Sequence, residues 1–165
     1  MKNGEMLSKA ILIATQAHAG QFDKGGKPYI LHPLTVLHKV GHVSEVIQSI
    51  AVLHDVVEDC TGKVIYIDGQ EVTISFAMLK EQGMTDDVVD GVKALTKMPG
   101  QTYEEYQAAV LNNRNAMVVK MEDLRTNSDL RRLKSKTITE KDVARVAKYM
   151  AFYAMISARL VEIEA

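Results

Sequence analysis

The sequence has little of what disulfide-bonded, membrane-spanning or nucleic-acid-binding proteins need. Its single cysteine, Cys60, cannot form an internal disulfide and fits a reducing compartment. The 20 basic residues are balanced by 21 acidic ones, so no excess of positive charge favours a phosphate backbone. No apolar run approaches the roughly 20 residues of a membrane span, and the run at 10–14 is short for a signal peptide. We therefore predict a soluble cytoplasmic protein that binds neither nucleic acid nor membranes.

Length and composition predict a single globular domain. The chain has 165 residues, within the range of about 100–200 that one domain usually occupies. Its 47% hydrophobic and 25% charged residues are an ordinary globular balance. A chain of this length buries about 70% of its unfolded surface, so it can fold without disulfides or a structural metal. We treat residues 1–165 as one domain.

Helical periodicity dominates the chain, and one segment departs from it. From the spacing of apolar residues we expect helices at 6–19, 34–40, 45–59, 75–82, 86–95, 103–111, 116–132 and 142–163. At about 63–75, two β-branched runs flank Asp68-Gly69, a dipeptide that is typical of tight hairpin turns. The pattern predicts an all-α helical bundle with one small β-hairpin.

Four polar residues interrupt the apolar helix predicted at 45–59. His54 and Asp55 are adjacent, and Glu58 and Asp59 follow them four positions later, so each pair lies one turn apart. Taken alone, such a group is most simply a solvated helix end. The apolar residues around it favour burial instead, and burial of these groups without a cation is costly. A bound divalent ion would resolve that conflict.

Further polar residues complete an ordered series along the chain. Asp123 and Asn127 share one face of the helix predicted at 116–132. His32 lies just before Pro33, where a histidine most simply bonds to backbone at a helix start. In order, the series is His32, then His54-Asp55, then Asp123. Two imidazoles and two carboxylates suit Mn²⁺, Fe²⁺ or Zn²⁺, with open positions for water and a substrate oxygen.

This series resembles the H…HD…D metal motif of the HD-superfamily phosphohydrolases. Residues 17–21, 24–33, 54–59, 90–96 and 119–127 are similar, in the same order, to the hydrolase domain of RelA/SpoT-type enzymes. The resemblance implies an HD-domain helical bundle and a metal-dependent enzyme. It also implies the reaction, which removes the 3′-pyrophosphate from guanosine tetra- or pentaphosphate.

The resemblance also implies a role for each matching residue. Mn²⁺ would be bound by His32, His54, Asp55 and Asp123. Glu58 and Asp59 would orient or deprotonate the attacking water, and Lys24 and Asn127 would contact the nucleotide. Other divalent ions suit the same donor atoms, so the identity of the metal stays open.

Two features depart from the family pattern. The family usually has an arginine that stacks on guanine where this chain has Asp23, and an acid cannot supply that contact. We expect a weaker preference for guanine, unless Asp23 accepts hydrogen bonds from guanine's N1–H and exocyclic amine. The predicted hairpin resembles an insertion, and three roles stay open for it: a roof over the pocket, a subunit contact or a tolerated surface insertion.

Two other functions compete with alarmone hydrolysis. The chain could be an HD-type phosphohydrolase that acts on another phosphorylated nucleotide. Asp23 favours this alternative, because it replaces the arginine that stacks on guanine in the family. It could also be a non-catalytic nucleotide-binding module, although the metal set with Glu58 and Asp59 argues against that. The sequence does not determine whether the chain forms homo-oligomers.

Overall fold

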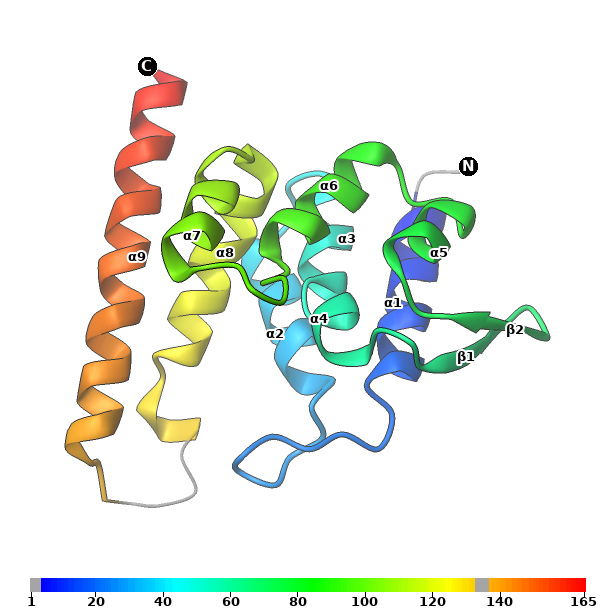
Figure 1. Ribbon diagram of the computed structural model, residues 1–165, viewed down its shortest axis with the longest axis horizontal. Coiled ribbons are helices and arrows are strands. Elements are labelled where there is room, and N and C mark those ends of the chain that lie inside the picture. The colour runs from blue at the N-terminus through cyan, green and yellow to red at the C-terminus, as the bar shows by residue number, and fades with distance from the viewer. Residues whose placement is uncertain (1–3, 133–136) are drawn as a thin grey trace.

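The computed structural model describes residues 4–132 and 137–165 (Figure 1). The helices are α1 (Glu5–Ala17), α2 (Leu31–Val40), α3 (Glu45–Leu53), α4 (Val56–Cys60), α5 (Phe76–Glu81), α6 (Asp86–Leu95), α7 (Tyr103–Leu111), α8 (Arg114–Asn127), the 3₁₀ helix η1 (Leu130–Arg132) and α9 (Glu140–Glu164). Strands β1 (Val64–Ile67) and β2 (Gln70–Thr73) form an antiparallel pair. The bundle with one hairpin is thus as predicted. Within the described ranges, no helix is both long and apolar enough to cross a bilayer.

Helix α3 is the central element of the bundle and leads into the predicted site. It packs against α1, α2, α6 and α8, which surround it (Figure 1). Its last four residues, 50–53, are completely buried. A helix that is apolar on several sides is typical of a core position, so the chain that follows α3 begins inside the protein.

The helix predicted over 45–59 is in fact two helices, with His54 and Asp55 in the turn between them. The ring Nδ1 of His54 lies 2.7 Å from the carbonyl oxygen of Ala51. That carbonyl can only accept, so Nδ1 carries the proton and donates it. A continuing helix would use this oxygen for the backbone N–H four residues later, and the side chain competes for it. The prediction of one unbroken helix was therefore wrong at these two residues.

Helix α2 begins three residues earlier than the apolar spacing predicts, and this places His32 and Pro33 in its first turn. Pro33 lacks an N–H, and in the first turn that N–H would have no helical partner anyway. Both His32 and Pro33 are buried. The early start therefore directs His32 into the bundle rather than into the preceding loop.

The hairpin has the turn that Asp68-Gly69 predicts. Both residues have positive φ, 51° and 79°, as a two-residue type I′ turn requires. The side chain of Gln16 on α1 accepts from the backbone N–H of Tyr66 and donates to its carbonyl, so α1 covers the edge of β1. Among the described residues, none from the hairpin lines either of the two cavities beside the site. The structure gives no support to a hairpin that roofs the pocket.

Gly91 on α6 marks a close contact between α6 and α3. A Cβ atom at this position would overlap the side chain of Ile50, most closely its Cδ1 atom, and would lie 2.9 Å from its Cγ1 atom. We expect Gly91→Ala to lower the free energy of unfolding by about 1–3 kcal/mol. The cost of fitting the added methyl group against Ile50 exceeds the stability gained from the better helix propensity of alanine. Urea denaturation measures the change, and Asp90→Ala at the exposed neighbouring position is the control.

A second substitution separates overpacking from other causes. Ile50→Val removes the Cδ1 atom that a Cβ at Gly91 would meet, so it should restore part of the stability lost in Gly91→Ala. A Gly91→Ala variant as stable as the unsubstituted protein would contradict the close contact.

Candidate functional site

Four side chains converge inside the bundle from α2, the α3–α4 turn and α8. Nε2 of His32 lies 2.9 Å from Oδ1 of Asp123 and 3.7 Å from Oδ2 of Asp55. Nε2 of His54 lies 3.1 Å from Oδ2 of Asp55 and 3.6 Å from Oδ1 of Asp123. The four residues that the sequence singled out as ligands therefore surround one point, although His32 and Asp123 are 91 positions apart.

His54 carries the clearest sign that this cluster suits a cation. Because its Nδ1–H is donated to Ala51, its Nε2 is the ring nitrogen that faces two carboxylates and is left to bind either a proton or a metal ion. Nε2 is buried and has no hydrogen-bond partner within the described chain. A polar atom in that state is costly unless a proton or a metal ion binds to it. One donor atom each from His32, His54 and Asp123 lies within 4.8 Å of the others, so these residues fit a divalent ion.

Asp123 is held through both of its oxygens. The ammonium of Lys120 lies 2.8 Å from Oδ2, and the amide of Asn127 donates to Oδ1 at 2.8 Å. Burial raises the pKa of Asp123, but the charge of Lys120 and the hydrogen bond with His32 hold it well below its usual range. The pKa of Lys120 is raised in turn, mainly by Asp123 and against the effect of burial. The aspartate therefore remains ionised and fixed in direction.

Asp55 receives a hydrogen bond from Tyr29, which lies in the loop between α1 and α2. The Tyr29 hydroxyl donates to Oδ2 of Asp55 at 2.7 Å. Burial raises the pKa of Asp55, but the positive charge that His54 carries when Nε2 is protonated lowers it to about 2. Burial and the charge of Asp55 raise the pKa of Tyr29, so its hydroxyl stays protonated and able to donate. Sequence reasoning missed Tyr29, whose only signal was its place in the family-like stretch at 24–33.

Glu58 and Asp59 lie on α4, immediately after the turn that holds His54 and Asp55, and both are exposed. An oxygen of Glu58 accepts the backbone N–H of Lys97. Although both side chains are exposed, neighbouring atoms shield their carboxyl groups partly from water, and this desolvation, together with the charge of Asp55, raises the pKa of both residues. Each therefore binds a proton more readily than an isolated surface carboxylate.

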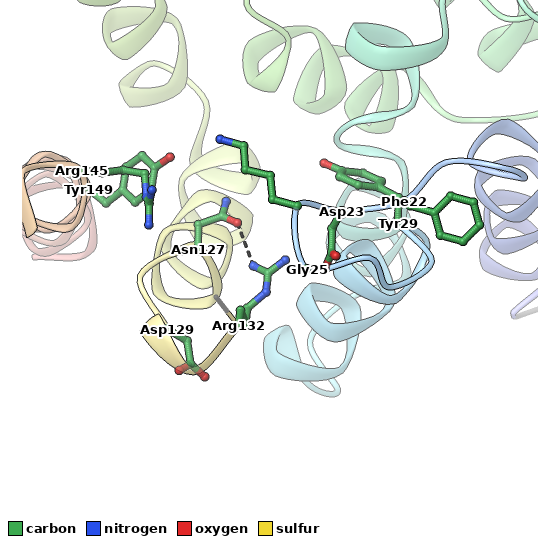
Figure 2. Close-up of a pocket in the computed structure, with 10 residues that line it drawn as sticks. Phe22, Asp23, Gly25, Tyr29, Asn127, Asp129, Arg132, Arg145 and Tyr149 are labelled. Carbon is green, nitrogen blue, oxygen red and sulfur yellow. Dashed lines mark hydrogen bonds between the residues drawn. The ribbon is translucent and has the colours of Figure 1, made fainter. Parts of the chain in front are cut away.

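Two cavities open beside the cluster. The first has a volume of about 340 Å³ and lies between the loop that carries Asp23 and Tyr29, the end of α8, and α9 (Figure 2). Arg132 is in the middle of this view and donates to Oδ1 of Asn127 at 3.0 Å. The second cavity has a volume of about 400 Å³ and reaches His32. The two cavities share three lining residues, Asp23, Asp129 and Arg132.

The residues that the sequence assigned to the nucleotide all line the first cavity: Asp23, Lys24 and Asn127. Arg145 and Tyr149 of α9 line its opposite side, and sequence reasoning missed them (Figure 2). Nothing in the sequence around Arg145 and Tyr149 sets them apart, and they reach the first cavity only because α9 packs against α8. No local sequence signal distinguishes them from other helical residues.

Asp23 also shapes the loop in which it lies. Its Oδ1 accepts the backbone N–H of Lys27 at 2.9 Å, and its own N–H is donated to the Lys27 carbonyl at 2.8 Å. Aspartate commonly stabilises tight turns through bonds of this kind. One carboxylate oxygen is thus engaged by the loop.

The chain is similar to several proteins of known name. No family model matches the chain. It is 31% identical over 124 residues to guanosine-3′,5′-bis(diphosphate) 3′-pyrophosphohydrolase of Vibrio cholerae, a match that covers 73% of this chain and 16% of that protein. The enzyme of the same name from Haemophilus influenzae is 35% identical over 118 residues, covering 69% of this chain and 15% of the relative. The match thus spans less than a fifth of these curated relatives.

A third relative and one solved structure extend the comparison. The bifunctional (p)ppGpp synthase/hydrolase SpoT of Escherichia coli is 30% identical over 121 residues, which cover 72% of this chain and 16% of SpoT. A solved structure, described as a metazoan SpoT orthologue that hydrolyses ppGpp, aligns with a TM-score of 0.68 and 21% identity. The alignment covers 97% of this chain and 88% of that one, so the two share the same fold over nearly their whole lengths.

Proposed function

The chain belongs to the RelA/SpoT-type family as a homologue of its hydrolase segment, and from that premise we propose that it removes the 3′-pyrophosphate of guanosine 3′,5′-bis(diphosphate) or a related alarmone. The observation that carries this proposal is the buried cluster of two imidazoles and two carboxylates beside a cationic cavity. Such a cluster suits phosphoryl chemistry, in which a bound cation offsets the charge of the phosphates.

We propose that His32, His54, Asp55 and Asp123 hold Mn²⁺, with other divalent ions able to take its place. The ion supplies positive charge that polarises a phosphoryl oxygen and makes water more acidic. The protein's own contribution is to fix the direction of its ligands. The Ala51 carbonyl directs Nε2 of His54 inward, and Tyr29 and Lys120 orient the two carboxylates.

Glu58 and Asp59 are proposed as the proton acceptors for the attacking water. A general base works best when its pKa lies near the working pH, and burial shifts both carboxyl groups in that direction. Their position on α4 keeps them one turn beyond His54 and Asp55. They can therefore act on water beside the cluster without belonging to it.

The first cavity is proposed to hold the nucleotide. Lys24, Arg132 and Arg145 provide positive charge for its phosphates, and Asn127 links the cavity to Asp123. Tyr149 offers an aromatic face on which a base can stack.

We also propose that residues 1–165 act as one domain. The packing of α1 on α3 and of α9 on α8 supports this, because elements from both ends of the chain join the same bundle. A cytoplasmic location is proposed as well, supported by the free, buried thiol of Cys60.

A panel of nucleotides tests the proposed reaction. The protein with Mn²⁺ is incubated with 3′-pyrophosphorylated and ordinary nucleotides, and we expect pyrophosphate release from the 3′-pyrophosphorylated ones alone. Faster hydrolysis of ordinary nucleotides would instead favour the broader phosphohydrolase, which remains the second candidate because of Asp23. Binding without turnover would favour a non-catalytic module.

The base preference is expected to depend on Asp23. We expect the unsubstituted protein to discriminate weakly between guanine and adenine 3′-pyrophosphates. Asp23→Arg should raise the guanine-to-adenine ratio of kcat/KM by about tenfold, since a cation stacked on a base contributes ~0.5–2 kcal/mol. Asp23→Asn is the matched control, because its amide oxygen can still accept the Lys27 N–H while the charge is lost. A strong native preference for guanine that Asp23→Arg weakens would instead indicate hydrogen bonding from Asp23 to guanine.

A further inference from the structure

The second cavity is rich in cations and is not accounted for by the nucleotide site. Its lining includes Lys27, Lys39, Arg131 and Arg132, against two acids, Asp23 and Asp129. No phenylalanine, tyrosine or tryptophan is among its described lining residues, whereas three such residues line the first cavity. The second cavity therefore lacks the flat apolar faces that bind a base and has the charge that binds phosphate.

Both acids in the second cavity are already engaged. The guanidinium of Arg131 donates to both oxygens of Asp129, at 2.9 and 2.8 Å, and these bonds lower the pKa of Asp129 to about 2. Asp23 accepts the backbone N–H of Lys27. The ammonium groups of Lys27 and Lys39 have no ion-pair partner in the described ranges, so they remain available to an anion.

The second cavity also adjoins the metal cluster. His32 lines it, and Nδ1 of His32 is buried without a hydrogen-bond partner among the residues that the structure describes. Lys39 reaches from α2 to α8 and donates to the hydroxyl of Thr126 at 2.9 Å, which holds its ammonium at the cavity wall. A phosphate group here would lie between this lysine and a ligand of the proposed metal.

We propose that the second cavity binds one pyrophosphoryl group of the substrate, while the first holds the nucleoside and the other phosphates. This inference rests on the proposed function, because the alarmone carries two such groups. One source is the 5′-diphosphate of the substrate. The other is the 3′-pyrophosphate, which is released as inorganic pyrophosphate. Both present the same chain of anionic oxygens to Lys27 and Lys39.

Binding of inorganic pyrophosphate to the metal-free protein tests the cavity without any need for turnover. Calorimetry should detect binding, and Lys27→Gln and Lys39→Gln should each weaken it by about tenfold, as expected for one lost bond to a charged group. Lys80→Gln, an exposed lysine on α5 paired with Asp86, should bind as the unsubstituted protein does. Absence of binding, or unchanged binding in both cavity variants, would overturn the proposal even if the enzyme hydrolyses alarmones.

Lys39→Arg separates loss of charge from damage to the fold. It keeps a cation that can reach Thr126, so pyrophosphate binding should stay within a few-fold of the original value. Binding lost equally in Lys39→Arg and Lys39→Gln, with unfolding transitions unchanged, would count against a site built on charge.

Two substrates distinguish the sources of the group. If the cavity takes the 5′-diphosphate, Lys39→Gln should raise the KM of guanosine 5′-diphosphate 3′-diphosphate more than that of its 5′-monophosphate analogue. If it takes the 3′ group, KM should rise equally for both, and product inhibition by pyrophosphate should weaken. Unchanged KM values together with unchanged product inhibition would overturn the proposal.

Discussion

Glu58→Gln and Asp59→Asn are each expected to lower kcat by at least ~10²-fold, the low end for the loss of a general acid or base. Each change keeps the size of the side chain but removes its ability to accept a proton. Both residues are exposed on α4 and lie outside the four-residue cluster, so metal content should be unchanged. Steady-state kinetics with metal analysis of the same samples measures both quantities.

The fold should tolerate these substitutions. In Glu58→Gln, the amide oxygen of the new side chain can still accept the backbone N–H of Lys97, so the contact between α4 and that loop is kept. Glu104→Gln, at an exposed position on α7, is the control for a lost negative charge. Full rates in both α4 variants would place the proton acceptor elsewhere in the site.

The pH profile gives an independent check on the same pair. A carboxylate must be deprotonated to accept a proton, so activity should fall as the pH drops through its pKa. Because burial and Asp55 raise the pKa of both residues, the fall should occur at a higher pH than for an ordinary surface carboxylate. In Glu58→Gln and Asp59→Asn, the residual activity should show a changed acid limb.

Elements with strong local signals could be predicted from the sequence. The Asp68-Gly69 turn fixes its hairpin because the dipeptide adopts positive φ at both positions. The helix predicted at 86–95 is found with the same bounds. The grouping of His32, His54, Asp55 and Asp123 was also accessible, because charged groups set into apolar helices are costly without a cation. The order of these residues along the chain suggested that they belong together.

What the sequence could not reveal depends on contacts between particular side chains and their surroundings. The break after α3 follows from one side-chain bond to the Ala51 carbonyl, and the apolar spacing continues across it without a change. Arg145 and Tyr149 join the first cavity only because α9 packs on α8. The contact of Gly91 with Ile50 was likewise invisible, since a glycine in a helix has many explanations.

Removal of the metal is expected to abolish activity, and loss of a single ligand should have the same effect. Chelation should stop turnover, and added Mn²⁺ should restore it, because the charge that offsets the phosphates is gone without the ion. His54→Asn is the most specific of these variants. The asparagine amide can still donate to the Ala51 carbonyl, whereas the buried Nε2 atom that would bind the ion is lost. His38→Asn on α2, an exposed histidine outside the cluster, is the control and should behave as the unsubstituted protein.

Thermal stability provides a second readout that does not depend on turnover. An ion that binds only the folded chain stabilises it by about 2.7 kcal/mol at a concentration 100 times its Kd. Mn²⁺ should therefore raise the Tm of the unsubstituted protein and of His38→Asn, but not that of His54→Asn. Asp123→Asn should also lose the shift, whereas Asp123→Ala would in addition remove the oxygen that the half-buried Lys120 ammonium contacts, and should unfold more easily. Activity that is indifferent to chelation, or an equal Tm shift in His54→Asn, would show that these residues do not hold the ion.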